Sequence, residues 1–376
     1  MRIIPTCFPW AGTAHLAGAI LLCFFGTGVY PVLAQINTGI VILDQEEQAR
    51  FRALLENRPE ARLLYDSIRA RADEHLAVAA DPISVIHYEG LLDTNPKRIA
   101  SVESLLDINR LIDMLYAGYG DEAQPYVPKI REIVLGWART YVPDGNTINE
   151  NKLTPLFWAY YMHQDAFSSG EQAEMEAWMY EIALREMTRV RTPNNNWQSK
   201  RLKIVGIIGG ILQNPTMQDF VVRGIKDFIG SSYFPDGTSI DLRRRDALAY
   251  HVSGIEPLLD LFINLQVFSE AFDLYDYISP SGSSVAKAID YVMPYVKGEK
   301  VHEEWVNTQV QLDKERAAAG LEKYRPGKLF EPQQALPMLR WAVYYHSEYM
   351  PLVCPDNPDG ACHIEALLNG PTVRGF

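Results

Sequence analysis

The sequence is poor in cysteine, with four residues among 376. It has no cluster of cysteine and histidine at the spacing of metal ligands, because His163, His302 and His346 stand far apart. We therefore expect neither a metal nor any other cofactor. Segments that alternate apolar and polar residues, as half-buried strands do, are almost absent, and no low-complexity stretch interrupts the chain. These absences argue against a metal-centred enzyme and against a scaffold of β-sheets.

Positive charge is also scarce, since 35 lysine and arginine residues against 47 aspartate and glutamate residues give a formal net charge of −12. Such an acidic balance argues against nucleic acid as a partner. The basic residues nevertheless gather in two clusters, one of Lys200, Arg201 and Lys203 and one of Arg243–Arg245. If the fold joins these clusters, they form a local positive site for carboxylates. The alternative is that each is a solvated helix face.

The N-terminal segment has the layout of a secretory signal peptide. Arg2 precedes an apolar run from Leu16 to Tyr30, and Val32-Leu33-Ala34 offers a cleavage site. We predict a signal peptide at residues 1–34 and a single mature domain at residues 35–376, secreted to the extracellular or periplasmic space and free of the membrane after cleavage. An uncleaved anchor is the alternative, although the run is shorter than the roughly 20 residues that a membrane span needs.

Cleavage would remove Cys7 and Cys23 and would leave Cys354 and Cys362. The remaining pair flanks the turn-forming residues 355–360. Two cysteines beside a short loop in an exported chain favour a disulfide. We therefore predict a Cys354–Cys362 bond, with two free thiols as the alternative.

Apolar residues recur at helical spacing through most of the mature sequence, beginning with Phe51–Ile68. Three capping patterns mark helix starts: Asp44 with Glu47, Ser169 with Gln172, and Thr216 with Asp219. Further helices are expected at residues 99–119, 124–141, 154–167, 175–183, 220–229, 248–268, 285–296, 301–319 and 332–349.

Helices of similar length joined by short turns are typical of stacked helical hairpins, so the predicted class is all-α. Such an array either continues as a solenoid or closes into an α/α toroid. The sequence has no repeat of fixed period, which consensus solenoids would show. We therefore predict an incomplete (α/α) toroid of about six or seven helical hairpins, with helix ends lining a cleft.

Three polar loops lead into helices, at residues 143–152, 192–201 and 234–251, and they are rich in asparagine, arginine or both. An asparagine before a helix is most often an N-cap, which accounts for any one loop. Together the three loops also fit a cleft that binds sugars, in which aromatic rings stack on pyranose faces and amides pair with hydroxyls.

Two of these loops carry a family resemblance. Asn195-Asn196-Trp197 is followed further along the chain by Arg-Arg-x-x-Ala-Leu-Ala-Tyr-His, which ends at His251. With this combination the sequence resembles the alginate lyase superfamily, and it is most similar to the α/α-toroid glucuronan and alginate lyases with an Asn-Asn-Trp loop. The similarity extends to Asn149–Lys152 and to the stretch from Trp305 to Tyr324, and it is strongest from Asn194 to Pro257.

The resemblance implies a polysaccharide lyase that cleaves 4-linked uronate polymers, alginate or glucuronan, by β-elimination. The C5 proton of a uronate is lost only when the adjacent carboxylate is neutralised by fixed donors. By resemblance Tyr250 is the catalytic acid or base, Asn196 and Lys200 lie at the carboxylate, and one arginine of Arg243–Arg245 lies near the phenol. Spacing does not settle which arginine this is; we choose Arg244 first and Arg245 second. The same resemblance gives candidates for substrate binding: Asn149, Asn195, Trp197, Gln198, Arg245 and His251. We expect these residues to converge on one cleft.

Relatives carry a histidine in the Asn-Asn-Trp loop, where this chain has Gln198-Ser199-Lys200. A protonated lysine neutralises a carboxylate but is a poor base. Tyr250 is therefore expected to act as both base and acid. His251 should point away from Tyr250 on a helix, which favours a structural role. That helix is expected to start near Asp246 and to leave the arginines in its entry loop.

Two other functions remain open. An inverting glycoside hydrolase on the same kind of toroid would pair Asp236 or Asp241 with Glu150, and needs its two carboxyl groups roughly 6.5–9.5 Å apart. A non-catalytic glycan-binding homologue would account for the missing histidine. For each reading the expected partner is an acidic polysaccharide, and we expect a monomer.

Overall fold

The computed structural model describes residues 36–120, 124–190, 192–357 and 360–375. These residues belong to one compact unit, Ala34–Phe376. The predicted signal peptide and its cleavage site lie outside the described residues, so cleavage and secretion stay predictions. In the described part of the chain, no helix is both long enough and apolar enough to cross a membrane.

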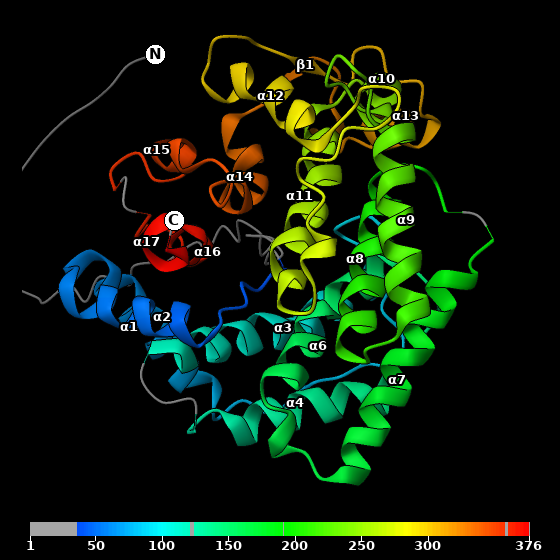
Figure 1. The fold of residues 1–376 in the computed structure, drawn as a ribbon. Helices are drawn as coiled ribbons and strands as arrows, with labels where there is room; N and C mark the ends of the chain where they lie inside the picture. Colours follow the sequence, from blue (N-terminus) through cyan, green and yellow to red (C-terminus); the bar gives the residue numbers. More distant parts are fainter. Residues whose placement is uncertain (1–35, 121–123, 191, 358–359, 376) are drawn as a thin grey trace, which may run out of the picture. The chain divides into compact units, whose positions relative to one another are not determined.

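The described residues are helical almost throughout (Figure 1). The α-helices are α1 (Gln45–Asn57), α2 (Pro59–His75), α3 (Pro96–Gly120), α4 (Val127–Thr140), α5 (Thr147–Glu150), α6 (Thr154–Met162), α7 (Ser169–Thr188), α8 (Asn196–Ile211), α9 (Pro215–Ser232), α10 (Ile240–Arg245), α11 (Leu248–Asn264), α12 (Val285–Val296), α13 (Gln311–Ala318), α14 (Leu336–Ala342), α15 (Met350–Val353), α16 (Ile364–Asn369) and α17 (Pro371–Arg374). The 3₁₀ helices are η1 (Asn151–Leu153), η2 (Gln164–Ala166), η3 (Leu265–Val267), η4 (Glu270–Phe272), η5 (Glu322–Tyr324), η6 (Pro332–Ala335) and η7 (Ser347–Tyr349). Two short strands, β1 (Glu303–Glu304) and β2 (Lys328–Leu329), pair in antiparallel fashion.

Capping side chains start several helices where the sequence predicted them, or within two residues. Asp44 and Glu47 form the predicted capping box of α1. The box at α7 is made by Ser168 with Glu171, one residue earlier than predicted. Asn214 caps α9 in place of Thr216, because its side chain accepts from the first backbone N–H groups after Pro215. Short polar side chains crowd these turns, so pattern alone does not decide which of them is the cap.

The core is built around α8, which packs against α7, α9 and α11. Leu202, Val205 and Ile208 are fully buried on α8. At its end a side chain on Gly210 would place Cβ 2.2 Å from the ring of Phe268, so only glycine permits this approach. Side-chain contacts further tie α8 to α11, and the first turns of the two helices lie at the same end of the pair.

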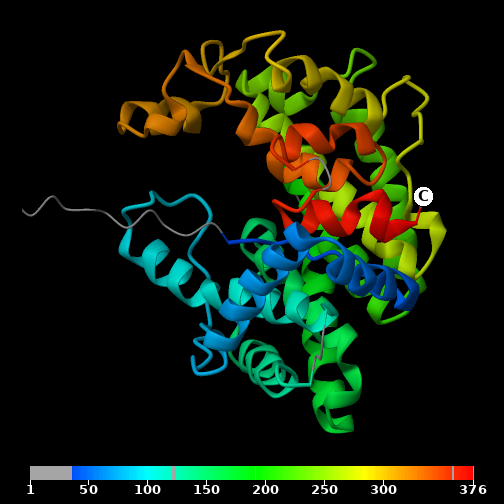
Figure 2. The same ribbon diagram turned by 90° about the vertical axis from the view of Figure 1, so that its left-hand side faces the viewer.

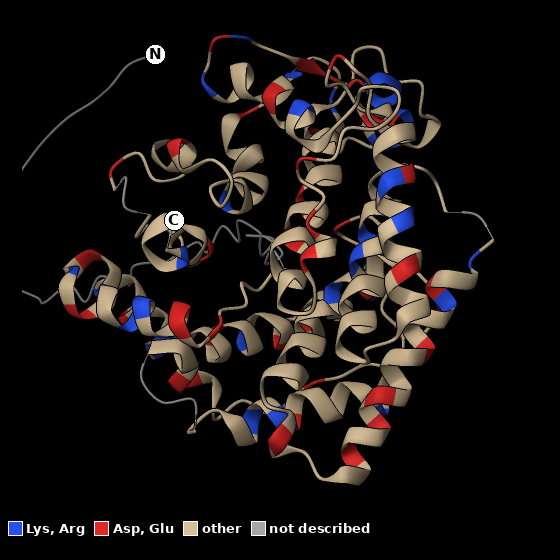
Figure 3. Cartoon of the chain, viewed as in Figure 1, with Lys and Arg blue, Asp and Glu red and all other residues tan. Residues whose placement is uncertain are grey.

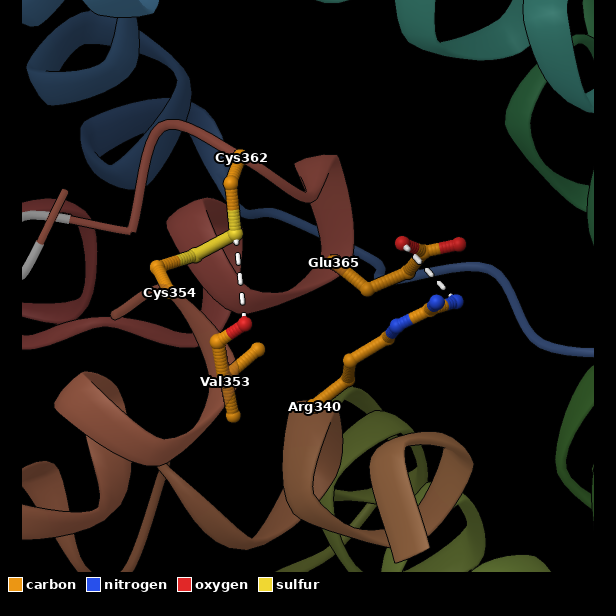
Figure 4. Close-up of a disulfide and its surroundings, with 5 residues drawn as sticks. All are labelled: Arg340, Val353, Cys354, Cys362 and Glu365. Atoms are coloured by element: carbon orange, nitrogen blue, oxygen red, sulfur yellow. Dashed lines mark hydrogen bonds and ion pairs between the residues drawn. A yellow bond between two sulfur atoms is a disulfide. The ribbon is translucent and has the colours of Figure 1, made fainter. Parts of the chain in front are cut away.

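The two ends of the unit also meet. Helix α1 packs against α17 and α2 against α16, and these blue and red segments are neighbours in Figure 2. The predicted disulfide lies in this region: Cys354 and Cys362 are bonded, with their Cα atoms 5.7 Å apart (Figure 4). Nearby, a 3.9 Å contact between Arg340 and Glu365 links α14 to α16. Acidic and basic residues are interspersed along the helices (Figure 3).

Residues 302–330, which we call the arm, depart from the predicted helix at 301–319. The helix is limited to α13, and β1 and β2 close the base of the arm. The arm is attached at Asp246, whose carbonyl accepts from the Trp305 N–H at 2.7 Å and whose carboxylate accepts from the Asn307 N–H at 2.8 Å. Both Asp246 (φ 54°) and Trp305 (φ 69°) are left-handed, a conformation that ends a helix and that periodicity does not reveal.

Candidate active site

Tyr250 lies in the first turn of α11, half-buried under the arm. The helix start has no side-chain cap of its own, since Ala247 occupies the N-cap position. Glu304 of the arm supplies the acceptor instead, because its Oε1 accepts from the Ala249 N–H at 2.8 Å. The arm therefore completes the turn that presents Tyr250.

Two groups fix the ring of Tyr250. The Trp305 indole meets it edge-on, with ring centroids 5.6 Å apart. On the ring face, the Arg245 guanidinium lies 4.1 Å from the centroid. Arg245 is in turn held by Asp313 at 2.6 Å and by Asp241 at 3.5 Å. The ring is thus clamped, and only the phenol end remains for chemistry.

The phenol oxygen of Tyr250 meets two residues that sequence reasoning missed. The hydroxyl of Tyr324 lies 3.3 Å away, and Nη1 of Arg316 lies 3.5 Å away. Burial raises the pKa of Tyr324. The resemblance had covered the stretch from Trp305 to Tyr324, but nothing in its spacing singled out these two side chains.

Tyr250 lines a small pocket, of about 10 Å³, together with Asn195 and Asn196. Asn195 caps α8, since its side chain accepts from the Trp197 N–H at 3.1 Å. The backbone N–H of Asn196 donates to Asp241 at 3.0 Å, while its side-chain oxygen is buried without a hydrogen-bond partner. Unpartnered buried polar atoms are rare, and one that faces a pocket is a candidate ligand contact.

The cluster on α8 is divided among three surroundings. Lys200 Nζ donates to the backbone oxygen of Ser253 at 3.0 Å and to its hydroxyl at 3.1 Å, and burial lowers the pKa of Lys200 to about 8. Arg201 instead donates to carbonyls at the end of α7. Lys203 is fully buried and pairs with Asp260 at 2.5 Å. Of the three, Lys200 is the one bonded to the beginning of α11, at Ser253, one helical turn after Tyr250.

Lys152 of η1 and Arg98 of α3 both contact Tyr88, which lies in the loop before α3. Lys152 Nζ lies 4.7 Å from the ring centroid of Tyr88, and the Arg98 guanidinium lies 3.9 Å from the same ring. The charge of Lys152 is the main cause that lowers the pKa of Tyr88, and Lys323 of the arm contributes to it. The same charge also acts on Lys200. The charges of Lys152 and Lys323 therefore both act on Tyr88, and that of Lys152 acts on Lys200 as well.

The side-chain amide of Asn149 is bonded to the protein backbone. Its Nδ2 donates to the backbone oxygen of Ile86 at 2.7 Å, and its Oδ1 accepts from the Glu89 N–H at 3.0 Å. Both bonds clamp the loop that carries Tyr88. The predicted substrate contact is thus occupied by the protein's own backbone, and Asn149 positions Tyr88.

Two further substrate-binding candidates of the α8 loop also lie elsewhere. Trp197 carries the Arg189 guanidinium over its ring at 4.9 Å. Gln198 accepts from Arg201 at 3.3 Å and lines a different pocket, of about 950 Å³, between α8 and α9. Because successive helix positions point about 100° apart, neighbours in this loop cannot all face Tyr250.

The histidine after Tyr250 faces inward, as helical geometry predicted. His251 is wholly buried, with Nε2 2.8 Å from the backbone oxygen of Ala288. Burial lowers its pKa to about 4, so the ring stays neutral. The geometry fits the structural role and not the substrate contact.

The choice of Arg244 does not fit the geometry. Its side chain is exposed, and within the described residues its guanidinium has no hydrogen bond or ion pair. Arg243 pairs with Asp236 at 2.7 Å and covers Phe234, and Arg245 is the member that contacts Tyr250. The arginines were expected in an extended entry loop, whereas they form α10, and the left-handed turn at Asp246 sets their directions.

The acids of the hydrolase alternative are bound to other groups. Asp236 is held by Arg243, and Asp241 accepts from the Asn196 backbone. Glu150 is wholly buried, where its Oε1 accepts from the N–H groups of Asp144 at 2.9 Å and Gly145 at 3.0 Å. These bonds leave no pair of acids facing each other at the Tyr250 pocket among the described residues.

Comparison with known proteins agrees with this geometry. The alginate lyase family model matches residues 107–302, more than half of the chain. An alginate lyase from Bacteroides ovatus shares the fold, with 16% sequence identity over 89% of this chain and 99% of that chain and a TM-score of 0.58. A variant of alginate lyase A1-III in complex with a tetrasaccharide is more distant, with 15% identity over 81% of this chain and 95% of that chain and a TM-score of 0.48. No curated protein sequence matches.

These findings confirm the predicted fold class, an all-α chain of the incomplete (α/α) toroid type. They also confirm the superfamily that the two loops indicated, because the matched residues include both of them. The chain therefore belongs to the alginate lyase family and is a polysaccharide lyase.

Proposed function

We propose that this chain cleaves 4-linked uronate polymers, alginate or glucuronan, by β-elimination at Tyr250. One observation carries the proposal: Tyr250 lines the same pocket as Asn196, whose buried amide oxygen has no hydrogen-bond partner among the described residues. Lys200 is bonded to Ser253, one turn along the same helix. A proton-transfer group, an amide and a cation are the three parts that elimination from a uronate requires.

Neutralisation of the substrate carboxylate falls to Asn196 and Lys200. Lys200 is bonded to the neutral Ser253 and forms no ion pair within the described residues, although the charges of Glu256 and Asp241 act on it. A carboxylate between these groups would no longer repel the electron pair left on C5 when the proton departs. The positive charge of Lys152 also acts on Lys200.

Proton transfer falls to Tyr250 in both steps. As a phenolate, Tyr250 takes the C5 proton, the electron pair of that C–H bond forms the C4–C5 double bond, and the C4–O4 bond breaks. The new phenol then gives the same proton to the departing O4, which restores the phenolate. Atoms and charge balance without a second base, and a single group on one face of the sugar ring suits syn elimination.

The missing loop histidine is compatible with this scheme. His251 lines the pocket but is buried, burial lowers its pKa to about 4, and its Nε2 lies 2.8 Å from the backbone oxygen of Ala288, so it is a neutral group held by the fold. Tyr250 is the remaining group with an acid–base hydroxyl that lines the pocket and is half-exposed. The Bacteroides ovatus relative is described as an alginate lyase, which supports a uronate polymer as the substrate class.

Export completes the proposal. We take residues 1–34 as a signal peptide and residues 35–376 as one secreted, monomeric lyase domain. The Cys354–Cys362 bond supports this location, since disulfides persist in oxidising compartments.

The test is product analysis on a panel of purified alginates and glucuronan. We expect products with a conjugated 4,5-unsaturated uronate, detected by ultraviolet absorbance and by a mass one water lower than that of the saturated oligosaccharide. Saturated oligosaccharides with new reducing ends would instead identify a hydrolase. Binding of these polymers without turnover would identify a glycan-binding homologue.

A further inference from the structure

Three polar groups meet at the Tyr250 phenol. Arg316 Nη1 donates to the Tyr324 hydroxyl oxygen at 3.0 Å. The two hydroxyl oxygens lie 3.3 Å apart and either can donate to the other, but once Tyr250 is a phenolate only Tyr324 carries a hydrogen for this bond. Arg316 reaches the Tyr250 oxygen as well, at 3.5 Å. Two donors from the arm thus converge on the one atom that the proposed reaction protonates and deprotonates.

Both donors keep their hydrogens. Burial raises the pKa of Tyr324, which is 9% exposed, so this phenol does not compete with Tyr250 for loss of a proton. The charge of Arg316 is not cancelled by a partner, since no carboxylate lies within ion-pair distance of it in the described part of the chain. Asp313, which lies on the same helix, is bonded to Arg245.

The remaining charged groups around Tyr250 are the following: Arg245 over its face, Asp313 and Asp241 at that arginine, Glu304 at the Ala249 N–H, and Lys323 beside Tyr324. Burial raises the pKa of each of the three acids. The three acids are bonded to Arg245 or to the Ala249 N–H, whereas Arg245 and Lys323 lie over the rings of Tyr250 and Tyr324.

We propose that Tyr324 and Arg316 are positioning residues that hold the Tyr250 phenol in place and stabilise its phenolate form during elimination. The inference rests on the proposed function and adds two residues to it. Tyr324 keeps its proton throughout: it donates a hydrogen bond to the phenolate before C5 is deprotonated and again after O4 has been protonated. The attachment of the arm at Asp246 is what brings both groups to α11.

Direct titration of Tyr250 tests this proposal. The full mature protein is labelled with carbon-13 at tyrosine Cζ, and the Tyr250 signal is assigned by its absence in Tyr250→Phe. We expect Arg316→Met to move the midpoint of this titration upward by about 1 pH unit or more, because a cation near the phenol is lost. Tyr324→Phe should move it upward by less, and Arg316→Lys should restore most of the original midpoint.

Arg325→Met is the matched control, because Arg325 lies on the same arm but is exposed and pairs with Glu322 at 2.8 Å. This change should leave the midpoint in place. On a polyuronate, Arg316→Met and Tyr324→Phe should lower kcat more than they raise KM, since both act through Tyr250.

An unmoved Tyr250 midpoint in Tyr324→Phe, or in Arg316→Met where it folds, would overturn the inference. So would a loss of activity that is equal at every pH and that lysine at position 316 does not relieve. Failure of the proposed function looks different, because the wild-type protein would then form no unsaturated product at all.

Discussion

Two lysines on successive turns of α8, Lys200 and Lys203, have different kinds of partner. Lys203 is 1% exposed and pairs with Asp260, also 1% exposed, while its ammonium donates to the Thr38 backbone at 2.8 Å. Lys200, one turn earlier, has hydrogen bonds to Ser253 and no ion pair within the described residues, and burial lowers its pKa. A lysine with a buried acid partner is part of the fold, whereas a lysine held beside a neutral group keeps its charge for a ligand.

The largest effect on stability is expected from a substitution of Lys203. Lys203→Met leaves the Asp260 carboxylate buried without its counter-charge, which should lower the free energy of unfolding by about 3–5 kcal/mol. Urea denaturation measures this. The double change Lys203→Met with Asp260→Leu should recover most of the loss, and a single variant as stable as the wild type would show that the pair does not hold α8 to α11.

Lys200 should show the reverse pattern. Lys200→Met should reduce kcat/KM on a polyuronate by about 10²-fold, the order of effect of one lost electrostatic donor. Because its charge is disfavoured by burial, the free energy of unfolding should change by less than about 1 kcal/mol. Initial rates with melting temperatures measure both. A stable protein with full activity would remove Lys200 from the carboxylate site.

The pH profile sharpens the role of Lys200. Its lowered pKa, about 8, means that the folded protein loses this charge as pH rises through 8, well before a solvated lysine would. Activity that needs the charge should therefore decline above that pH. Lys200→Arg keeps its charge, so the decline near pH 8 should disappear. A decline at the same pH in both proteins would assign it to another group.

The smallest effect is expected at Arg244. Arg244→Gln should change the free energy of unfolding, and kcat/KM expressed as a free energy, by less than about 0.5 kcal/mol each. The reason is that the exposed guanidinium has no hydrogen bond or ion pair within the described residues. Arg245→Gln, the matched change at the ring of Tyr250, should reduce both. Equal losses in the two variants would mean that Arg244 also acts on the substrate.

Sequence reasoning reached the fold class, the family and the pairing of the Asn196 loop with Tyr250, because helical periodicity and contiguous motifs record these features directly. The resemblance named Lys200 and not Lys203, but the sequence does not reveal why they differ, since the difference lies in Asp260 and Ser253 on another helix. The partner residues at the phenol were out of reach for the same reason. Arg316 and Tyr250 are 66 residues apart in sequence.

Local conformation limited the prediction as well. A left-handed residue at Asp246 separates α10 from α11 and turns Arg244 outward. Periodicity had suggested one entry loop and one helix there. Asn149 was predicted to contact the sugar, whereas both the nitrogen and the oxygen of its side-chain amide are hydrogen-bonded to the backbone of the neighbouring loop.

The central claim is that the Tyr250 phenol transfers the proton, and Tyr250→Phe tests it most directly. This change keeps the ring that Trp305 and Arg245 hold and removes only the hydroxyl. The measurement is the initial rate of ultraviolet-absorbing product on the best polyuronate, with melting temperature as the control for folding. We predict a loss of about 10²–10⁴-fold or more, with stability changed by about 1 kcal/mol at most. A well-folded Tyr250→Phe protein that forms the unsaturated product at a near wild-type rate would contradict the account.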